Sequence, residues 1–157
     1  MKRYPEIVDY SDLLVPERQW LSLAGHLRAW SHDPDVQVGA VMLPGTGRQA
    51  MGMGWNRFPV GIPVPSKGMD QDTKRATILH AEAVAMNNCI APQGGTLFMS
   101  GAPMCSHCAA LAVENRVAKI VMQHRHISRQ IGRRWVESHE LAKGILRKAG
   151  IVLFDVE

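Results

Sequence analysis

The spacing of apolar residues along the chain predicts strands separated by helices. In residues 16–31 the apolar positions recur mostly every three or four residues, as on one face of a helix, and Pro16 suits its first turn. Alternation in Val36 to Leu43 and in Gln49 to Trp55, on either side of a Pro-Gly turn, predicts a β-hairpin. The later pattern predicts helical segments at about 72–90, in one or two pieces, and at 105–115 and 134–149. It also predicts strands at 96–99, 119–122 and 151–154. An opening hairpin followed by alternating strands and helices indicates an α/β domain with a mixed sheet.

Two stretches lack this periodicity. Residues 1–15 are expected to form an irregular N-terminal arm, and residues 56–71 form a long loop, which in compact domains often carries function. Residues 1–157 together have the length of a single domain. An apolar share of 46% and a charged share of 20% are those of a globular protein and exclude a disordered chain.

Composition and charge bear on location and partners. No stretch approaches the roughly 20 apolar residues of a membrane span, and the N-terminus shows no secretory signal, so we expect a cytoplasmic protein without a membrane partner. The net charge of +4 suits anionic partners such as phosphorylated metabolites or nucleic acid, although many enzymes share this balance by chance. Aromatic residues do not interleave the basic cluster between His124 and Arg134. A nucleic-acid substrate is therefore left open but not indicated.

Two short motifs carry side chains that suit a metal centre. His80-Ala81-Glu82 and, about 25 residues later, Cys105-Ser106-His107-Cys108 each fall near the expected start of a helix. One imidazole and two thiolates make a three-ligand set for Zn²⁺ that leaves one position open for water. Two neighbouring helix N-termini would bring the ligands together and help to keep both thiols deprotonated. We therefore expect His80, Cys105 and Cys108 to bind Zn²⁺ as the cofactor.

Glu82 lies two residues after His80, which leaves its carboxylate beside the metal rather than on it. A carboxylate in that place can take a proton from water and deliver it to a ring nitrogen and then to departing ammonia. His-x-Glu followed by Pro-Cys-x-x-Cys is the pattern of zinc deaminases. The Cys-x-x-Cys motif by itself would also suit a redox pair, or a structural zinc site with His107 or Cys89 as a fourth ligand.

The surroundings of these motifs carry a further pattern. Ser31 to Val41 and Gly54 to Ile62, the latter similar to a Gly-Tyr-Asn-Gly-Phe-Pro segment, together with Lys74 six residues before the histidine, resemble deoxycytidylate deaminases. Gly144 to Ile151 resembles their closing helix and strand, so the similarity to the cytidine/deoxycytidylate deaminase family covers about residues 16–154. The resemblance implies a three-layer α/β/α sandwich around a five-stranded mixed sheet. It also implies a homo-oligomer with active sites near subunit contacts.

The resemblance implies substrate contacts as well. Asn56 would contact the sugar of a nucleotide, and the base pocket would be lined by the segment Val38, Gly39 and Ala40 together with Ala81. A nucleotide also requires cations for its phosphate. The candidates for that role are Arg57, Lys67 and Lys74.

Three departures from the family pattern affect these expectations. Met104 separates Pro103 from the first cysteine, where the family has proline directly before it, and Ala102 replaces a glutamate. Val84 stands where members often carry asparagine. Arg57 replaces the glycine that follows the substrate asparagine. The resemblance implies that some members bind regulatory deoxynucleoside triphosphates near this segment, and Arg57 would either bind phosphate there or block that site.

The sequence therefore predicts a zinc-dependent deaminase whose partner is a small nucleotide. The leading reaction is hydrolysis at C4 of a cytosine nucleotide, with deoxycytidylate converted to deoxyuridylate and ammonia. The alternatives are a deaminase of cytidine, of guanine or of a base in tRNA, and a non-catalytic, zinc-stabilised nucleotide-binding subunit.

Overall fold

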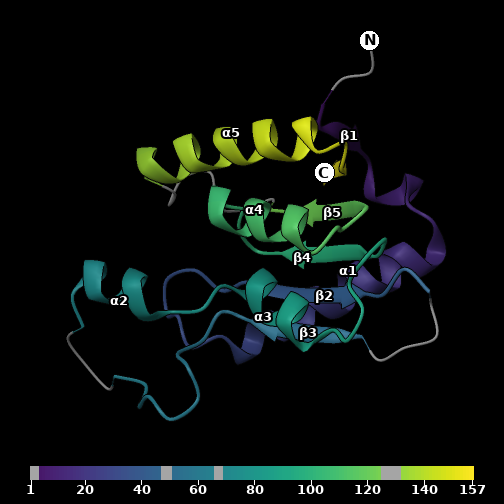
Figure 1. Ribbon diagram of the computed structural model, residues 1–157. Coiled ribbons are helices and arrows are strands. Elements are labelled where there is room, and N and C mark those ends of the chain that lie inside the picture. The colour runs from purple at the N-terminus through teal and green to yellow at the C-terminus, as the bar shows by residue number, and fades with distance from the viewer. Residues whose placement is uncertain (1–3, 47–50, 66–68, 125–131) are drawn as a thin grey trace.

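The computed structural model describes residues 4–46, 51–65, 69–124 and 132–157, which form a six-stranded mixed sheet flanked by helices (Figure 1). The strand order is β1-β6-β5-β4-β2-β3, with β2 antiparallel to both of its neighbours and the other pairs parallel. The strands are β1 (Glu6–Val8), β2 (Gly39–Leu43), β3 (Gly52–Trp55), β4 (Thr96–Ser100), β5 (Lys119–Gln123) and β6 (Val152–Val156). The predicted α/β class with a mixed sheet is confirmed.

The sixth strand comes from the segment expected to be an irregular arm. β1 pairs parallel with β6, with Glu6 opposite Phe154, and the short 3₁₀ helix η1 (Tyr10–Asp12) follows it. The Tyr4 hydroxyl donates a hydrogen bond to the carbonyl of Ile151 at 3.0 Å and ties the same segment to the start of β6. The expectation of five strands is therefore wrong by one, because a three-residue strand that pairs with the other end of the chain leaves no periodicity to detect.

Helices cover both faces of the sheet, which confirms the three-layer arrangement (Figure 1). α1 (Val15–Leu27), extended by η2 (Arg28–Trp30), packs on one face. The other face is covered by α3 (Ala81–Asn88), α4 (Ser106–Glu114) and α5 (Arg133–Lys148), and the remaining α-helix of the described residues is α2 (Gln71–Thr77). No helix in the described part of the chain is long and apolar enough to cross a membrane.

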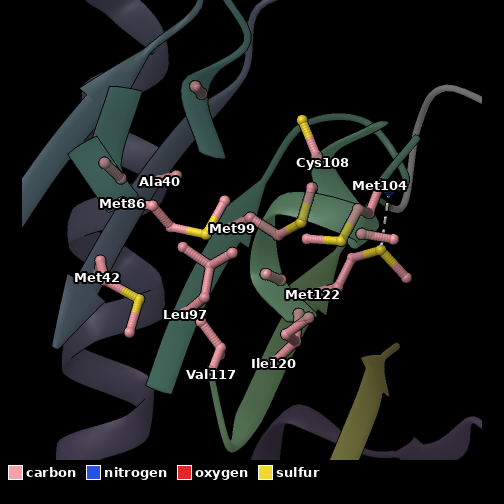
Figure 2. Packing of buried hydrophobic residues seen from close by; sticks show 14 of the residues in the cluster. Ala40, Met42, Met86, Leu97, Met99, Met104, Cys108, Val117, Ile120 and Met122 are labelled. Carbon is pink, nitrogen blue, oxygen red and sulfur yellow. Dashed lines mark hydrogen bonds between the residues drawn. The ribbon is translucent and has the colours of Figure 1, made fainter. Parts of the chain in front are cut away.

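The strand register explains why the central strands are apolar throughout. Val41, Phe98 and Val121 stand opposite one another on β2, β4 and β5 and pack against α1. Their neighbours Met42, Leu97 and Ile120 are also in register and point to the other face. Strands that are buried on both faces need apolar residues at successive positions. Methionines fill much of the space under α3 and α4 (Figure 2).

Two element boundaries shape the site, and one of them differs from the prediction. β2 begins at Gly39 rather than Val36, because the Val36 carbonyl and the Val38 N–H bond to the Asn56 side chain instead of a neighbouring strand. The helical character predicted over 72–90, in one or two pieces, forms two helices, α2 and α3, with a break at 78–80. The predicted first residues of β3, 49 and 50, lie outside the described residues.

Candidate active site

The metal-ligand candidates lie at the N-termini of two adjacent helices. His80 is the N-cap residue of α3, Cys105 is the N-cap residue of α4, and Cys108 lies in the first turn of α4. The break between α2 and α3 leaves His80 extended, which directs its ring toward α4. The Nδ1 atom of His80 lies 3.3 Å from Sγ of Cys105 and 3.5 Å from Sγ of Cys108. The three ligand atoms lie within 4.8 Å of one another.

These separations fit a zinc ion. Tetrahedral zinc with Zn–N bonds of about 2.0 Å and Zn–S bonds of about 2.3 Å places its nitrogen and sulfur ligands roughly 3.5 Å apart. The imidazole and the two sulfurs are also the donor types that this ion prefers. The side chains around the cluster are mainly apolar, and they hold both cysteines buried. The donor set, its spacing and its surroundings therefore suit zinc held by three protein ligands, with a fourth position for water.

The electrostatics of the cluster favour one thiolate in the metal-free protein. Hydrogen bonds from Cys108 and then from His80 lower the pKa of the Cys105 thiol. In turn, the hydrogen bond to Cys105 raises the pKa of His80 to about 9, against the opposing effect of burial. The hydrogen bond between the Cys108 and Cys105 side chains, together with burial, raises the pKa of the Cys108 thiol above its usual range. The site thus combines a cationic imidazole with a sulfur anion at a helix N-terminus.

Glu82 lies in the first turn of α3, one residue beyond Ala81, and its side chain is buried beside the cluster. Burial raises the pKa of Glu82, while the positive charge of His80 acts in the opposite direction. A carboxyl group whose pKa is raised toward neutrality can both accept and donate a proton during one reaction cycle. The structure therefore places a buried carboxyl group next to the three candidate metal ligands.

Asn56, expected at the sugar, organises the loop that leads into β2. Its Oδ1 accepts hydrogen bonds from the Ser31 hydroxyl at 2.6 Å and from the Val38 backbone N–H at 2.8 Å. Its Nδ2 donates to the Val36 carbonyl at 2.7 Å. These bonds fix the backbone of residues 31–38. Val38, at the end of this segment, belongs to the core cluster that contains Cys105 and Cys108.

The other base-pocket candidates divide between the two faces of the sheet. Val38, Ala40 and Ala81 belong to the core cluster that contains Cys105 and Cys108. Gly39 packs toward α1, where a Cβ atom would come within 2.0 Å of the Ala24 carbonyl oxygen. A side chain is excluded there by the helix, so Gly39 allows α1 to pack closely against β2.

The cationic candidates are held differently from what was expected. Lys74 Nζ forms ion pairs with Asp33 Oδ1 at 3.0 Å and Asp35 Oδ2 at 2.8 Å, which joins α2 to the loop before β2. Arg57 exchanges backbone hydrogen bonds with Leu79, and its guanidinium donates to the Phe58 carbonyl at 3.2 Å. Lys67 lies outside the described residues.

Arg57 also lines a pocket of about 340 Å³ between α3 and α4. The remaining lining residues are Leu79, Ala83, Val84, Met86, Asn87, Leu111 and Asn115. None of the four residues proposed for metal binding and proton transfer lines this pocket.

Sequence reasoning missed the contribution of α5. The ring of Trp135 lies 5.8 Å from the ring of His80, centroid to centroid, and Ser138 and His139 lie on the same face of the helix. The only signal in the sequence is the spacing of these three residues, three and four apart. That spacing does not reveal which loop the helix face meets.

The fold and the site together define an α/β domain with an imidazole and two cysteine sulfurs beside a buried carboxylate, an arrangement suited to hydrolysis. Residues 16–124 match the cytidine and deoxycytidylate deaminase zinc-binding region. The chain belongs to this family of deaminases, which are hydrolases acting on C–N bonds. The expected family membership is confirmed.

Individual relatives agree with this assignment. A probable deoxycytidylate deaminase of Caenorhabditis elegans is 28% identical over 73% of this chain. The matched region covers 60% of the length of the nematode protein. An uncharacterized deaminase of Aliivibrio fischeri is 24% identical over 85% of this chain and 88% of its own length. The dCMP deaminase of cyanophage S-TIM5, solved in complex with dCMP and dUMP, shares the fold with a TM-score of 0.69 at 18% identity, covering 91% of this chain and 99% of the phage protein.

Proposed function

We propose that the protein is a zinc-dependent deaminase of a cytosine nucleotide, with dCMP converted to dUMP and ammonia as the leading reaction. The observation that carries the proposal is the cluster of His80, Cys105 and Cys108 beside buried Glu82. The nematode relative is a probable deoxycytidylate deaminase and the phage protein is a dCMP deaminase, which supports the choice of dCMP. A cytoplasmic homo-oligomer, expected from the sequence, belongs to the same proposal.

In this proposal the chain's residues have separate roles. His80, Cys105 and Cys108 hold zinc, which when bound lowers the pKa of a coordinated water to near neutrality. Glu82 accepts a proton from the attacking water and delivers it to N3 of the cytosine ring. It then accepts the proton of the new hydroxyl group on C4 and delivers it to the amino group, which leaves as ammonia. The apolar packing around Glu82 keeps other water away, and this burial raises the pKa of the Glu82 carboxyl group above its usual value.

Substrate contacts follow from the loop fixed by Asn56. Val38, Ala40 and Ala81 form the floor of the base pocket beside the cluster, and Gly39 keeps that strand close to α1. The carboxamide oxygen of Asn56 already accepts two hydrogen bonds within the protein. A sugar hydroxyl would therefore be met by the second hydrogen of Nδ2. For the phosphate we propose Arg57, since the two carboxylates beside Lys74 neutralise that ammonium group.

The ion pairs of Lys74 also favour a second candidate. Asp33 and Asp35 add negative charge where a nucleotide phosphate was expected to meet a lysine, and this disfavours an anionic substrate there. An uncharged substrate, cytidine or a free base, would not be repelled. Deamination of a nucleoside or base is therefore the alternative function.

The decisive experiment measures ammonia release by the zinc-loaded protein with cytosine, adenine and guanine bases, their nucleosides and their 5′-nucleotides. The proposal predicts turnover of dCMP, and Arg57→Ala should raise KM for dCMP without a matching rise for deoxycytidine. Faster turnover of deoxycytidine or cytidine than of dCMP would replace the first candidate with the second. Absence of turnover with every compound, with zinc bound, would contradict both.

A further inference from the structure

One face of α5 forms hydrogen bonds with the loop that carries the first cysteine. Trp135 Nε1 donates to the Pro103 carbonyl at 3.1 Å. His139 Nδ1 lies 3.0 Å from the Met104 carbonyl and must donate to it, because a carbonyl oxygen can only accept. Ser138 Oγ accepts from the Ser106 backbone N–H at 3.0 Å and lies 3.1 Å from the Ser106 hydroxyl.

These bonds bracket Cys105 on both sides. The bonded backbone groups belong to Pro103, Met104 and Ser106, so α5 fixes the peptide before the cysteine and the peptide after it. The N–H of Met104 approaches Sδ of Met122 on β5 at 3.4 Å, which adds a contact from the sheet (Figure 2). The direction in which Cys105 presents its sulfur is therefore determined by groups outside its own helix.

The other half of the same helix face anchors α5. Ala142 and Leu146 follow Ser138 and His139 at helical spacing and are buried in the core cluster under α4 and α5. The apolar half holds the helix in place, and the polar half then meets the ligand loop at a fixed distance. Trp135 at the beginning of the face lies against the His80 ring as well, so the face touches both sides of the ligand set.

We infer that Trp135, Ser138 and His139 are positioning residues that preorganise Cys105 and His80 for metal binding. The inference rests on the zinc site of the proposed function. Groups that orient metal ligands typically change metal affinity by 10–100-fold when they are removed. The effect should therefore appear in zinc affinity itself, before any substrate is added.

The test measures the Kd for Zn²⁺ of metal-free protein by competition with a chelator, together with the melting temperature of each metal-free variant. The variants are Ser138→Ala, His139→Phe and Trp135→Phe. The last of these keeps an aromatic ring but removes the indole N–H that donates to Pro103. Leu141→Ala, at an exposed position of the same helix, is the matched control. Ser138→Thr keeps the hydroxyl and tests for rescue.

We expect the Kd for Zn²⁺ to rise about 10–100-fold in the loop-facing variants. Leu141→Ala and Ser138→Thr should stay within about threefold of the unmodified protein. Ser138→Ala is the mildest change, so it decides the question if His139→Phe fails to fold. Unchanged zinc affinity in the loop-facing variants, even with lowered melting temperatures, would overturn the inference. An equal loss in Leu141→Ala would overturn it too.

The same experiment separates this inference from the proposed function. If the unmodified protein fails to bind Zn²⁺, the zinc site and the inference that rests on it are both wrong. If the unmodified protein and the three variants bind Zn²⁺ equally well, the zinc site stands and the positioning role alone is lost.

Discussion

Replacing Gly54 by alanine should damage both stability and activity, because α3 lies against the backbone of β3 at that point. A Cβ atom on Gly54 would lie 2.3 Å from the Ala81 carbonyl oxygen, 2.6 Å from the Ala85 nitrogen and 3.0 Å from the Val84 Cβ. Ordinary van der Waals contact begins at about 3.4 Å. Two of these neighbours are backbone atoms and cannot rotate away, so α3 itself must withdraw by about 1 Å.

The consequences follow from what α3 carries. Ala81 stands between His80 and Glu82, so a displacement of the helix moves a proposed ligand and the proposed proton carrier together. Overpacking of this kind costs about 1–3 kcal/mol of folding free energy. A misplacement of about 1 Å at reacting groups lowers the rate on the order of 100-fold.

Urea unfolding and the rate of ammonia release test this prediction in parallel. Gly144→Ala is the control, because no atom lies within 4 Å of a Cβ there and the position is inside α5. That substitution should stabilise the protein by about 0.5–1 kcal/mol and leave the rate unchanged. If Gly54→Ala unfolds with the same free energy as the unmodified protein and deaminates at half its rate or faster, the reasoning about α3 is refuted.

Further predictions concern the ion pairs and the metal. Lys74→Met leaves the buried carboxylate of Asp33 without its ion-pair partner and should lower the free energy of unfolding in urea by about 3 kcal/mol. Asp35→Asn, at a largely exposed side chain, should lower it by less than about 1 kcal/mol. A larger loss for Asp35→Asn than for Lys74→Met would contradict the pairing. The hydrogen bond from Lys74 lowers the pKa of Asp35 in the folded protein. The small contribution of this ion pair to the free energy of unfolding is therefore complete above about pH 4 and is lost as the pH falls through the folded-state pKa of Asp35. Removing zinc with a chelator, from free metal at about 100 times Kd, should lower the melting temperature by roughly 5–10 °C. The chain should stay folded at 25 °C, because the two apolar clusters on the two faces of the sheet supply the main stabilisation of the fold; loss of the helical circular dichroism signal on chelation would indicate a structural metal instead.

The sequence was most informative where function depends on local pattern. His80 and the two cysteines could be grouped because each motif lies near the start of a predicted helix, and the structure brings their ligand atoms within 4.8 Å of one another. The strand periodicity likewise predicted β2, β4, β5 and β6, since strands buried on both faces need continuous apolar residues.

Contacts between distant segments could not be read in this way. β1 is three residues long and pairs with the opposite end of the chain, so no local sequence pattern predicts it. Lys74 was assigned to a phosphate because it is a cation near the motif, but its carboxylate partners lie about 40 residues earlier in the chain. The contacts of α5 with the loop around Cys105 depend on how two helices dock, which helical spacing alone does not specify.

The most direct test of the central claim is to compare the unmodified protein with Glu82→Gln for bound zinc and for ammonia release from dCMP. The account predicts that the variant keeps one zinc ion per chain, since Glu82 is not a ligand, and that its turnover falls by a factor of about 10²–10⁴ because the proton carrier is lost. Zinc retained together with turnover close to that of the unmodified protein would contradict the proposed role of Glu82 and, with it, the mechanism.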